Sequence, residues 1–449
     1  MIKSDGIAVG AACSLIIAAA GVGAWLLATG VRIEVYAPPL FGWLSPRVGP
    51  GTPAVIGLAI IAVLLAQRFA AVQSWRRVMI IGYLTAIAWT VSLAMIDGWS
   101  GGLGSRLTNG HEYLHELGRI TSLGEFLATF SDHILDFQPG SWTTHVAGHP
   151  PGVTGLFWLF QQAGLGGGDW AAVIIVVVGC LAAVAVPATV RALGAPEAAR
   201  RIIPFTVLLP GALWVGVSAD GLFAGVAAAG LALVVVGVRS RWPGWPVPVF
   251  AGGLLLGLVP YLSYGLILYG LVVAAAAGLT LRLDGRRVLG RWLVATGAVA
   301  LVAIAFTAAG FAWWEGLSLV HTRYYQGVAT DRPYAYFVWA NLAAFLIMVG
   351  PIMAAAVVRA VRALPGIGGR SRVAPEQLVP AVLGLAGFAT VLLADLSGLS
   401  KAETERIWLP FGYVVAIAAA LLPAVSARAG LAFSVLLTVV VAHLVWTPW

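Results

Sequence analysis

The sequence predicts an all-α polytopic membrane protein with about thirteen transmembrane helices and a long first loop on the non-cytoplasmic side. Composition is the first observation, since the 449 residues are 60% hydrophobic and only 10% charged, whereas soluble domains carry about 25% charged residues. Long apolar runs are the second, because a helix needs roughly 20 apolar residues to cross the hydrocarbon. The third is that the basic residues lie in short loops between these runs.

The apolar runs predict spans whose bounds are approximate. They cover residues 7–29, 53–71, 78–96, 170–190, 202–218, 221–238, 246–261, 264–281, 288–312, 335–357, 377–395, 407–425 and 429–447. The first run is too long for a signal peptide. The segment 152–163 is apolar but short, and as a span it would invert every basic loop that follows. We therefore expect it to be a re-entrant or interfacial helix on the outer face.

The basic loops orient the chain. Placing them all in the cytoplasm gives one consistent membrane topology, with the N-terminus inside and the C-terminus outside. The expected location is the plasma membrane. The arginines concerned are Arg76, Arg77, Arg191, Arg200, Arg201, Arg239, Arg241, Arg282, Arg286, Arg287, Arg291, Arg359, Arg362, Arg370, Arg372 and Arg428. The formal net charge of +8 is dispersed in this way, so we expect no nucleic-acid partner.

Three regions are expected along the chain. Residues 1–76 hold two N-terminal spans, residues 77–334 form a catalytic module with the outer loop 97–169, and residues 335–449 hold the last spans with the outer loop 397–406.

Both cysteines, Cys13 and Cys180, fall inside apolar spans. They predict buried apolar packing and neither a disulfide nor a metal cluster.

Polar chemistry concentrates in the segment 97–151, which contains six acidic residues and five of the seven histidines. Loops of this length in compact proteins are usually functional. Asp97 lies at the outer end of an apolar span, where partial desolvation can tune a carboxylate for proton abstraction. The alternative is an ordinary helix-end aspartate that faces interfacial water. Tyr113 in the same loop is a candidate substrate-binding residue.

A second group of candidates lies in the stretch WTTHVAGHPPG at 142–152. Its prolines and glycines predict a rigid turn that holds His145 and His149 at the membrane boundary, where imidazoles can donate to a phosphate or a sugar hydroxyl. A rigid turn with hydrogen-bonded histidines is the ordinary alternative. Metal binding is disfavoured, because the H-x3-H spacings lack a motif-like glutamate or cysteine partner.

Three further outer segments contribute candidates. Glu403 and Arg406 stand at the start of a late span, where charges are costly unless paired or functional, and an arginine there suits bidentate phosphate binding. A snorkelling pair that anchors the helix end is the alternative.

Arg323, Tyr324 and Arg332 suit sugar stacking and phosphate neutralisation, or an interfacial aromatic belt. Asp220 either adds to the site or caps the following helix, with the cap slightly favoured.

These features together predict one chemistry. A lipid-linked phosphosugar holds its phosphate at headgroup level, where an arginine can stabilise the leaving phosphate. Asp97 can deprotonate an acceptor hydroxyl that attacks the anomeric carbon from the opposite face. A single displacement of this kind inverts the anomeric configuration, and it requires no cofactor and no metal.

The motifs also carry a family resemblance. Asp97 at the start of the first large outer loop, the GHPPG element at 148–152 and the stretch Pro210, Trp214 and Ser218–Asp220 resemble the GT-C superfamily of polyprenyl-phosphate-dependent glycosyltransferases. Similarity is highest to actinobacterial members that decorate cell-envelope glycans, in particular mycobacterial transferases of methylthioxylose to the mannose caps of lipoarabinomannan. The resemblance covers most of residues 78–420. It implies that Asp97 is the base and that His145, His149, Glu403 and Arg406 line the site.

The chain departs from the family pattern in two ways. Two additional spans precede the one that leads to Asp97, and no tandem acidic pair follows it, which leaves Glu112, Asp132 and Asp136 as alternative bases. The expected partners are a polyprenyl-phosphate-linked sugar, a glycan or lipoglycan acceptor and the bilayer. The main alternative is a transporter or flippase of lipid-linked precursors, which would be expected to carry ionisable or broken-helix positions at mid-membrane. A non-catalytic scaffold of an envelope-synthesis complex is the other.

Overall fold

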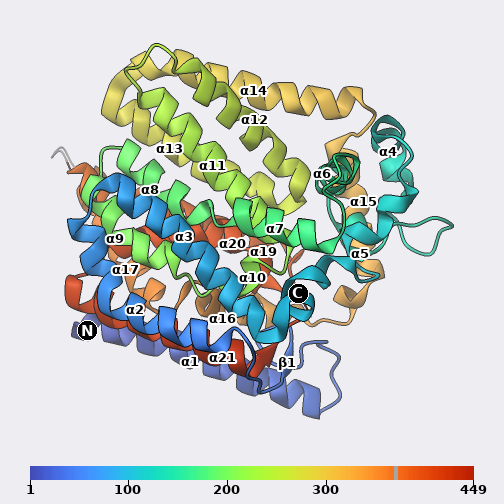
Figure 1. The fold of residues 1–449 in the computed structure, drawn as a ribbon, viewed down its shortest axis with the longest axis horizontal. Helices are drawn as coiled ribbons and strands as arrows, with labels where there is room; N and C mark the ends of the chain where they lie inside the picture. Colours follow the sequence, from blue (N-terminus) through green and yellow to red (C-terminus); the bar gives the residue numbers. More distant parts are fainter. Residues whose placement is uncertain (369–372, 449) are drawn as a thin grey trace.

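The computed structural model describes residues 1–368 and 373–448 and shows an almost entirely helical chain (Figure 1). The first helices are α1 (Lys3–Ala28), α2 (Thr52–Val72), α3 (Trp75–Ala94), α4 (Leu123–Thr129), α5 (Thr144–Gly148), α6 (Pro151–Gln162) and α7 (Gly168–Gly179). The central helices are α8 (Ala182–Ala192), α9 (Pro196–Val207), α10 (Ala212–Val215), α11 (Ala219–Arg239), α12 (Pro246–Leu262), α13 (Gly270–Asp284) and α14 (Leu289–Ala308).

The last helices are α15 (Trp313–Gln326), α16 (Tyr334–Val349), α17 (Ile352–Gly368), α18 (Pro375–Leu396), α19 (Thr404–Ile407), α20 (Leu409–Val415) and α21 (Ala424–Leu444). Short 3-10 turns and one π-turn occupy Met95–Asp97, Ser100–Gly104, Arg106–Thr108, Tyr113–Arg119, Phe130–His133, Tyr264–Tyr269, Gly285–Val288, Val328–Thr330 and Ala416–Leu421. Two strands, β1 (Trp43–Leu44) and β2 (Val445–Trp446), pair antiparallel.

The protein is a multi-pass membrane protein by the length and apolarity of its helices. Among the residues that the structure describes, eight helices are long and apolar enough to cross a membrane, and nine if a bent pair counts as one span. The expected number of about thirteen is not confirmed. Two predicted spans correspond to apolar helices that are shorter than a span, Pro246–Leu262 and Leu409–Leu421.

Two predicted spans are broken, and each break has a local cause. The predicted span 202–218 divides into α9 and α10, with Pro210 in the non-helical link between them, because proline lacks the N–H that a helix needs. The predicted span 335–357 bends by 101° between α16 and α17. At this bend Gly350 adopts a φ of +87°, and the freed Met348 carbonyl accepts a hydrogen bond from the Gly211 N–H at 2.8 Å.

The connections at one end of the bundle carry the basic residues. Arg200 donates to the Ala70 and Gln73 carbonyls at 2.6 and 2.8 Å, and Arg239 donates to the Ala192 carbonyl at 2.6 Å and pairs with Asp284. These contacts bring the α2–α3, α8–α9, α11–α12 and α13–α14 connections together, and the N-terminus lies at the same end (Figure 1). Arg370 and Arg372 lie outside the described residues.

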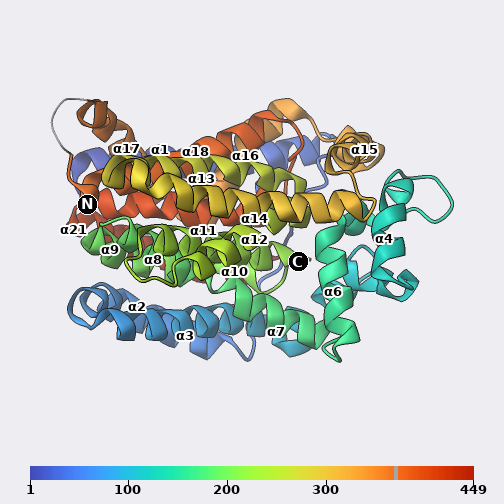
Figure 2. The same ribbon diagram turned by 90° about the horizontal axis from the view of Figure 1, so that it is seen from above.

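The opposite end collects the long polar loop. In Figure 2 the helices α4 and α6 of this loop stand across the direction of the bundle helices, with α15 beside them. The segment 152–163 therefore forms a helix of its own, α6, rather than part of a bundle span. The β1–β2 pair and the C-terminus lie toward this end (Figure 1). The N-terminus and the C-terminus thus lie toward opposite ends of the bundle.

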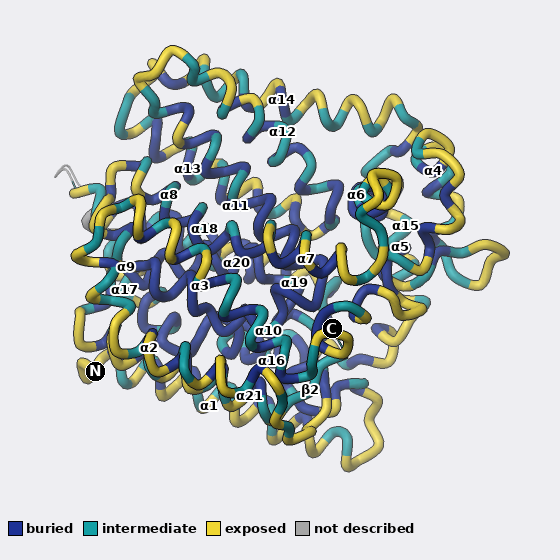
Figure 3. The backbone as a smooth tube through the Cα atoms, viewed as in Figure 1, coloured by how far each residue is buried: buried dark blue, intermediate teal, exposed yellow. Residues whose placement is uncertain are grey.

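Burial divides the helices into central and peripheral ones. In Figure 3 the traces of α11 and α20 are largely buried, while α1, α2 and α14 show long exposed stretches. The apolar window of α11 is 83% buried inside the protein, whereas that of α2 is only 17% buried. Apolar faces left open in this way suit lipid contact. The central helix α11 begins at Ser218–Asp220, and its position fixes where these polar residues lie.

The two ends can be assigned to membrane sides by cysteine labelling. In a background with Cys13 and Cys180 replaced by alanine, Gln138→Cys lies in the long loop and Arg241→Cys lies in a basic connection, and both positions are exposed. We expect a membrane-impermeant maleimide applied to intact cells to label Gln138→Cys only, because basic loops stay cytoplasmic. Labelling of both variants, or of Arg241→Cys alone, would contradict the orientation.

Candidate functional site

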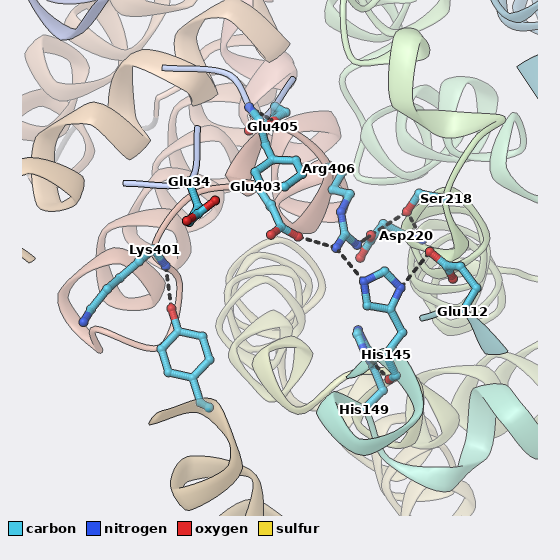
Figure 4. A network of polar contacts seen from close by, with 12 residues as sticks. Glu34, Glu112, His145, His149, Ser218, Asp220, Lys401, Glu403, Glu405 and Arg406 are labelled. Atoms are coloured by element: carbon cyan, nitrogen blue, oxygen red, sulfur yellow. Dashed lines mark hydrogen bonds and ion pairs between the residues drawn. The ribbon is translucent and has the colours of Figure 1, made fainter. Parts of the chain in front are cut away.

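The polar end holds a buried ionic cluster centred on Arg406, which we call the Arg406 hub (Figure 4). The Arg406 guanidinium contacts Asp220 Oδ2 at 2.7 Å and Glu403 Oε2 at 2.5 Å. Its Nη2 lies 3.3 Å from His145 Nε2. The side chain comes from α19, while its partners come from the start of α11, the loop before α19 and α5. The hub therefore joins three parts of the chain that are far apart in sequence.

His145 lies between Glu112 and Arg406. Its Nδ1 lies 2.7 Å from Glu112 Oε1, and its Nε2 faces Arg406. A carboxylate only accepts and a guanidinium only donates. His145 Nδ1 can therefore donate to Glu112, while its Nε2 faces a group that only donates. The Glu112–His145–Arg406 chain links the long loop to α19.

A second histidine and a tyrosine close the hub on the loop side. His149 Nδ1 lies 2.8 Å from the His145 carbonyl oxygen, to which it donates, and burial lowers the pKa of His149 to about 4. The Tyr113 ring packs against both imidazoles, with centroid distances of 5.9 Å to His145 and 5.5 Å to His149. Burial also raises the pKa of the Tyr113 hydroxyl. Both groups are therefore uncharged near neutral pH.

The charged groups of the hub offset the effect of burial on one another's pKa values. Burial alone would raise the pKa of Glu403, but the charges of Arg406 and Arg332 lower it. Burial would likewise lower the pKa of Arg406, yet Glu403, Asp220 and Glu112 raise it. Two guanidinium groups, Arg406 and Arg332, thus face the three carboxylates Asp220, Glu403 and Glu112. Both nitrogens of the Arg406 fork are already engaged by carboxylates, so the hub offers an additional anion little free guanidinium surface.

Arg332 extends the hub to the segment between α1 and α2. Its Nη1 lies 3.6 Å from Glu403 Oε1 and donates to the Lys401 carbonyl at 2.8 Å. Its other nitrogens donate to the carbonyls of Ile33 and Glu34. Glu403 itself adopts the left-handed conformation, with φ +62°, which is uncommon for a residue other than glycine. Its carboxylate reaches Arg406 from this constrained position.

Glu405 is a second buried carboxyl on α19. Its Oε1 accepts from the Phe41 N–H at 2.9 Å, while its Oε2 is buried and has no hydrogen-bond partner among the described residues. Burial raises the pKa of Glu405 to about 7. This carboxyl therefore holds the segment 33–44 onto α19, in contrast to the fully ionised Glu403 two residues earlier.

Asp97 lies in a different polar cluster, beside an open cleft of about 620 Å³. Its Oδ1 pairs with Arg47 Nε at 2.7 Å and its Oδ2 with Arg106 Nη2 at 3.2 Å. Asp97 and Arg106 line the cleft together with Asn109, His111 and Trp446. Two guanidinium groups here face one carboxylate, so this cluster carries net positive charge. We call it the Asp97 cleft.

The hub and the Asp97 cleft share a chain segment. His111 lines the cleft, and the next residue, Glu112, pairs with His145 in the hub. The His111 carbonyl also accepts from the His145 N–H at 3.0 Å. The two clusters are therefore adjacent, and the position of the segment 109–113 depends on both.

The remaining predicted residues are distributed as follows. The Tyr324 hydroxyl accepts from the Lys401 N–H at 2.8 Å and so borders the hub through Lys401. Arg323 lies apart from it, in an ion pair with Asp136. The expectation that Asp220 caps its helix is wrong, because the α11 N-cap is Ser218, whose hydroxyl accepts from the Asp220 N–H at 3.0 Å. The Asp220 side chain pairs with Arg406 instead.

Sequence reasoning missed three residues of the Asp97 cleft. Arg47 and Arg106 carry no motif, and Trp446 lies near the opposite end of the chain from Arg47. A signal existed for Arg47 and Arg106, which are basic residues within loops predicted to be outside the cytoplasm, where arginine is disfavoured by the positive-inside rule. Among the described residues, no group of three or more His, Cys, Asp or Glu side chains is placed to hold a metal ion.

Comparisons with known proteins give structural neighbours only. No model of a known protein family matches the chain, and no curated protein matches it. One similar solved structure is an oligosaccharyltransferase of Archaeoglobus fulgidus in complex with Zn and sulfate, with a TM-score of 0.46, 16% identity, and coverage of 83% of this chain and 54% of that one. Another is the oligosaccharyltransferase AglB of Archaeoglobus fulgidus with an inhibitory peptide and a dolichol-phosphate, with a TM-score of 0.38, 16% identity, and coverage of 79% and 50%.

The chain thus spans about half the length of these two structures. Both neighbours are named oligosaccharyltransferases, and neither is a methylthioxylose transferase. The sequence resemblance to that mycobacterial activity has no support in these comparisons.

Removing Arg406 tests the structural role of the hub. Arg406→Met leaves the buried Asp220 carboxylate with the hydrogen bond from the Ser218 hydroxyl but without its ion-pair partner. We expect the free energy of unfolding to fall by about 3–5 kcal/mol, measured as a lower melting temperature of the purified protein. The double variant Arg406→Met with Asp220→Asn removes the uncompensated charge, so its loss should be smaller than the sum of the single losses.

The control for this variant is Arg32→Met, which breaks an exposed ion pair with Asp331. Exposed pairs contribute only about 0–1 kcal/mol, so its melting temperature should stay near that of the wild type. A wild-type melting temperature for Arg406→Met would show that the hub does not hold the fold together.

The raised pKa of Glu405 predicts that the stability of the protein depends on pH. Its folded pKa of about 7 exceeds the ordinary value of 4.5, so between these values the folded chain keeps a proton that the unfolded chain releases. The resulting stability is full below pH 4.5 and is lost as the pH rises through 7. We expect the difference in melting temperature between wild type and Glu405→Gln to change over this window and to level off above it. A pH-independent difference would contradict the protonated state of Glu405.

Proposed function

We propose that the protein is an inverting glycosyltransferase of GT-C type, which moves a sugar from a polyprenyl-phosphate donor to a cell-envelope glycan or lipoglycan on the outer face of the plasma membrane. The observation that supports this most directly is the Asp97 cleft, where one carboxylate, two guanidinium groups and an indole meet at the polar end of the bundle. A volume of about 620 Å³ is in the range of small-molecule sites.

Charge distinguishes the cleft from the hub as the place for the donor phosphate. Arg47 and Arg106 face the single carboxylate Asp97, whereas Arg406 is already surrounded by carboxylates. Planar guanidinium groups bind phosphate in a bidentate manner. In this proposal Arg106 takes the phosphate, and Arg406 organises the site from behind rather than contacting the donor, which revises the role that the sequence suggested.

Donor binding would also activate the base. Arg106 now occupies Asp97 Oδ2 at 3.2 Å, and a phosphate that competes for this guanidinium frees the oxygen. Asp97 then accepts the proton of the acceptor hydroxyl while the hydroxyl oxygen bonds to the anomeric carbon. The bond from that carbon to the phosphate oxygen breaks, and Arg106 stabilises the departing phosphate. Arg47 keeps the carboxylate oriented through Oδ1.

The other predicted residues fit around this step. His145 pairs with Glu112 and so holds the segment 109–113, whose Tyr113 ring packs against His145 and His149. Asp220 and Glu403 neutralise Arg406. Within this class the sequence resemblance favours a pentose such as methylthioxylose as the sugar and a lipoglycan such as lipoarabinomannan as the acceptor. We expect no cofactor.

Asp97→Asn tests the transferase proposal. The amide keeps the size of the side chain but cannot act as a base, and we expect transfer to fall by about 10²–10⁴-fold. Envelope glycans and lipoglycans of a deletion strain, complemented with wild type or variant, are compared by mass spectrometry. A sugar missing from the deletion strain should return with wild type and with Asp132→Asn, an exposed acidic residue of the same loop, but not with Asp97→Asn. Glycans that do not differ between the deletion and wild-type strains would contradict the proposal and favour transport or scaffolding.

A further inference from the structure

Three aromatic side chains form a row that begins in the Asp97 cleft, and we call it the aromatic row: Trp446, Trp43 and Tyr36. Trp446 lines the cleft and lies directly opposite Trp43 in the β1–β2 pair, with ring centroids 5.4 Å apart. The Trp43 ring stacks on Tyr36 at 5.4 Å with an interplanar angle of 17°. The row therefore leads from the candidate reaction centre to the surface of the segment between α1 and α2.

The outer members of the row keep ring surface that the rest of the protein does not cover. Tyr36 is 44% exposed and Trp43 is 39% exposed, so their stacking on each other leaves part of each ring uncovered. The Tyr36 hydroxyl donates to Glu34 Oε2 at 2.7 Å. The Glu34 backbone has a positive φ of +50°, which is uncommon for a residue other than glycine. Aromatic faces flanked by a carboxylate present both the apolar and the hydrogen-bonding surface that a sugar chain requires.

An interfacial aromatic belt is the competing interpretation, since tryptophan and tyrosine are common at membrane boundaries. Two observations favour a saccharide. The row ends among charged groups, with the Arg106 guanidinium 5.5 Å from the Trp446 ring. It is also held in place from the protein side, because the Phe41 N–H donates to Glu405 and Arg332 donates to the carbonyls of Ile33 and Glu34. A belt residue needs neither a rigid support nor a connection to a charged cleft.

We propose that the aromatic row is the binding platform for the acceptor, an oligosaccharide chain whose terminal unit reaches Asp97 over Trp446 while the preceding units stack on Trp43 and Tyr36. This inference rests on the proposed function, and it assigns the acceptor to the segment 33–47 and the C-terminal strand. In the same proposal the donor phosphate binds Arg106 in this cleft. The platform implies a preference for acceptors several sugars long, because a single sugar reaches Trp446 only.

The test compares Trp43→Ala with Trp43→Phe and with the control Trp314→Ala, whose indole on α15 is 66% exposed and lies outside the row. The full-length proteins, purified in detergent, are applied to immobilised manno-, arabino- and galacto-oligosaccharides of about one to six units. We expect Trp43→Ala to raise the half-saturating concentration for chains of about three units or more by about fivefold, the scale of one lost aromatic contact. Single sugars should be unaffected, Trp43→Phe should be intermediate, and Trp314→Ala should match wild type.

Transfer to the same oligosaccharides, with bacterial membranes as the donor source, separates this inference from the proposed function. If wild type transfers and Trp43→Ala transfers equally well at every chain length, the platform is refuted while the transferase stands. Length-dependent binding that Trp43→Ala weakens to the expected degree, without any transfer by wild type, supports the platform and refutes the transferase. Equal binding by Trp43→Ala and wild type, or loss of binding in Trp314→Ala to the same degree, identifies the row as an ordinary aromatic belt.

Discussion

The polar end of the molecule depends on the neutralisation of one buried guanidinium, that of Arg406. A buried charge is tolerated only when it is paired and hydrogen-bonded, and the partners that satisfy this requirement come from separate elements. Asp220 lies at the start of the central helix α11, Glu403 lies in the loop before α19, and His145 connects Arg406 to Glu112 in the long loop. The charge requirement therefore determines where the long loop docks on the bundle.

The position of the cleft follows from that docking. Glu112 in the hub is adjacent in sequence to His111 in the cleft, and Arg332 ties the hub to the segment that carries Trp43. Residues of the hub thus hold His111 and also the segment whose Trp43 packs against Trp446 of the cleft. The two clusters differ in charge and therefore in role. The hub has more carboxylates than guanidinium groups and holds structure, whereas the cleft has more guanidinium groups than carboxylates and suits an anionic ligand.

The helical, membrane-embedded class followed from composition and apolar runs. Few structures can span lipid, because every backbone polar group there must be hydrogen-bonded within the protein. The sequence did not yield the number of spans. Pro210 breaks one predicted helix, and Gly350 with Pro351 bends another, and only tertiary contacts such as that of Gly211 with Met348 decide how such breaks are used. The sequence did point to the concentration of charged residues in the segments at the polar end, since charges at a membrane boundary need a reason to be there.

The pairing of these charges was beyond sequence reasoning. Arg406 has the features of a phosphate ligand when it is considered with its neighbours in the chain, and its burial between Asp220 and Glu403 emerges only when α11 and α19 pack together. Asp97 similarly looks like an isolated carboxylate, although Arg47 and Arg106 occupy both of its oxygens. Contacts between residues such as Arg106 and Thr447, which are 341 positions apart, leave no trace in local patterns.

The most direct test of this account is a structure of the protein in lipid nanodiscs with a non-hydrolysable polyprenyl-phosphate sugar analogue. We expect the phosphate to bind Arg106 in the Asp97 cleft and Asp97 Oδ2 to be released toward the acceptor side. The Arg406 ion pairs with Asp220 and Glu403 should remain closed. A phosphate bound to Arg406, with those ion pairs opened and Arg106 still on Asp97, would contradict this expectation.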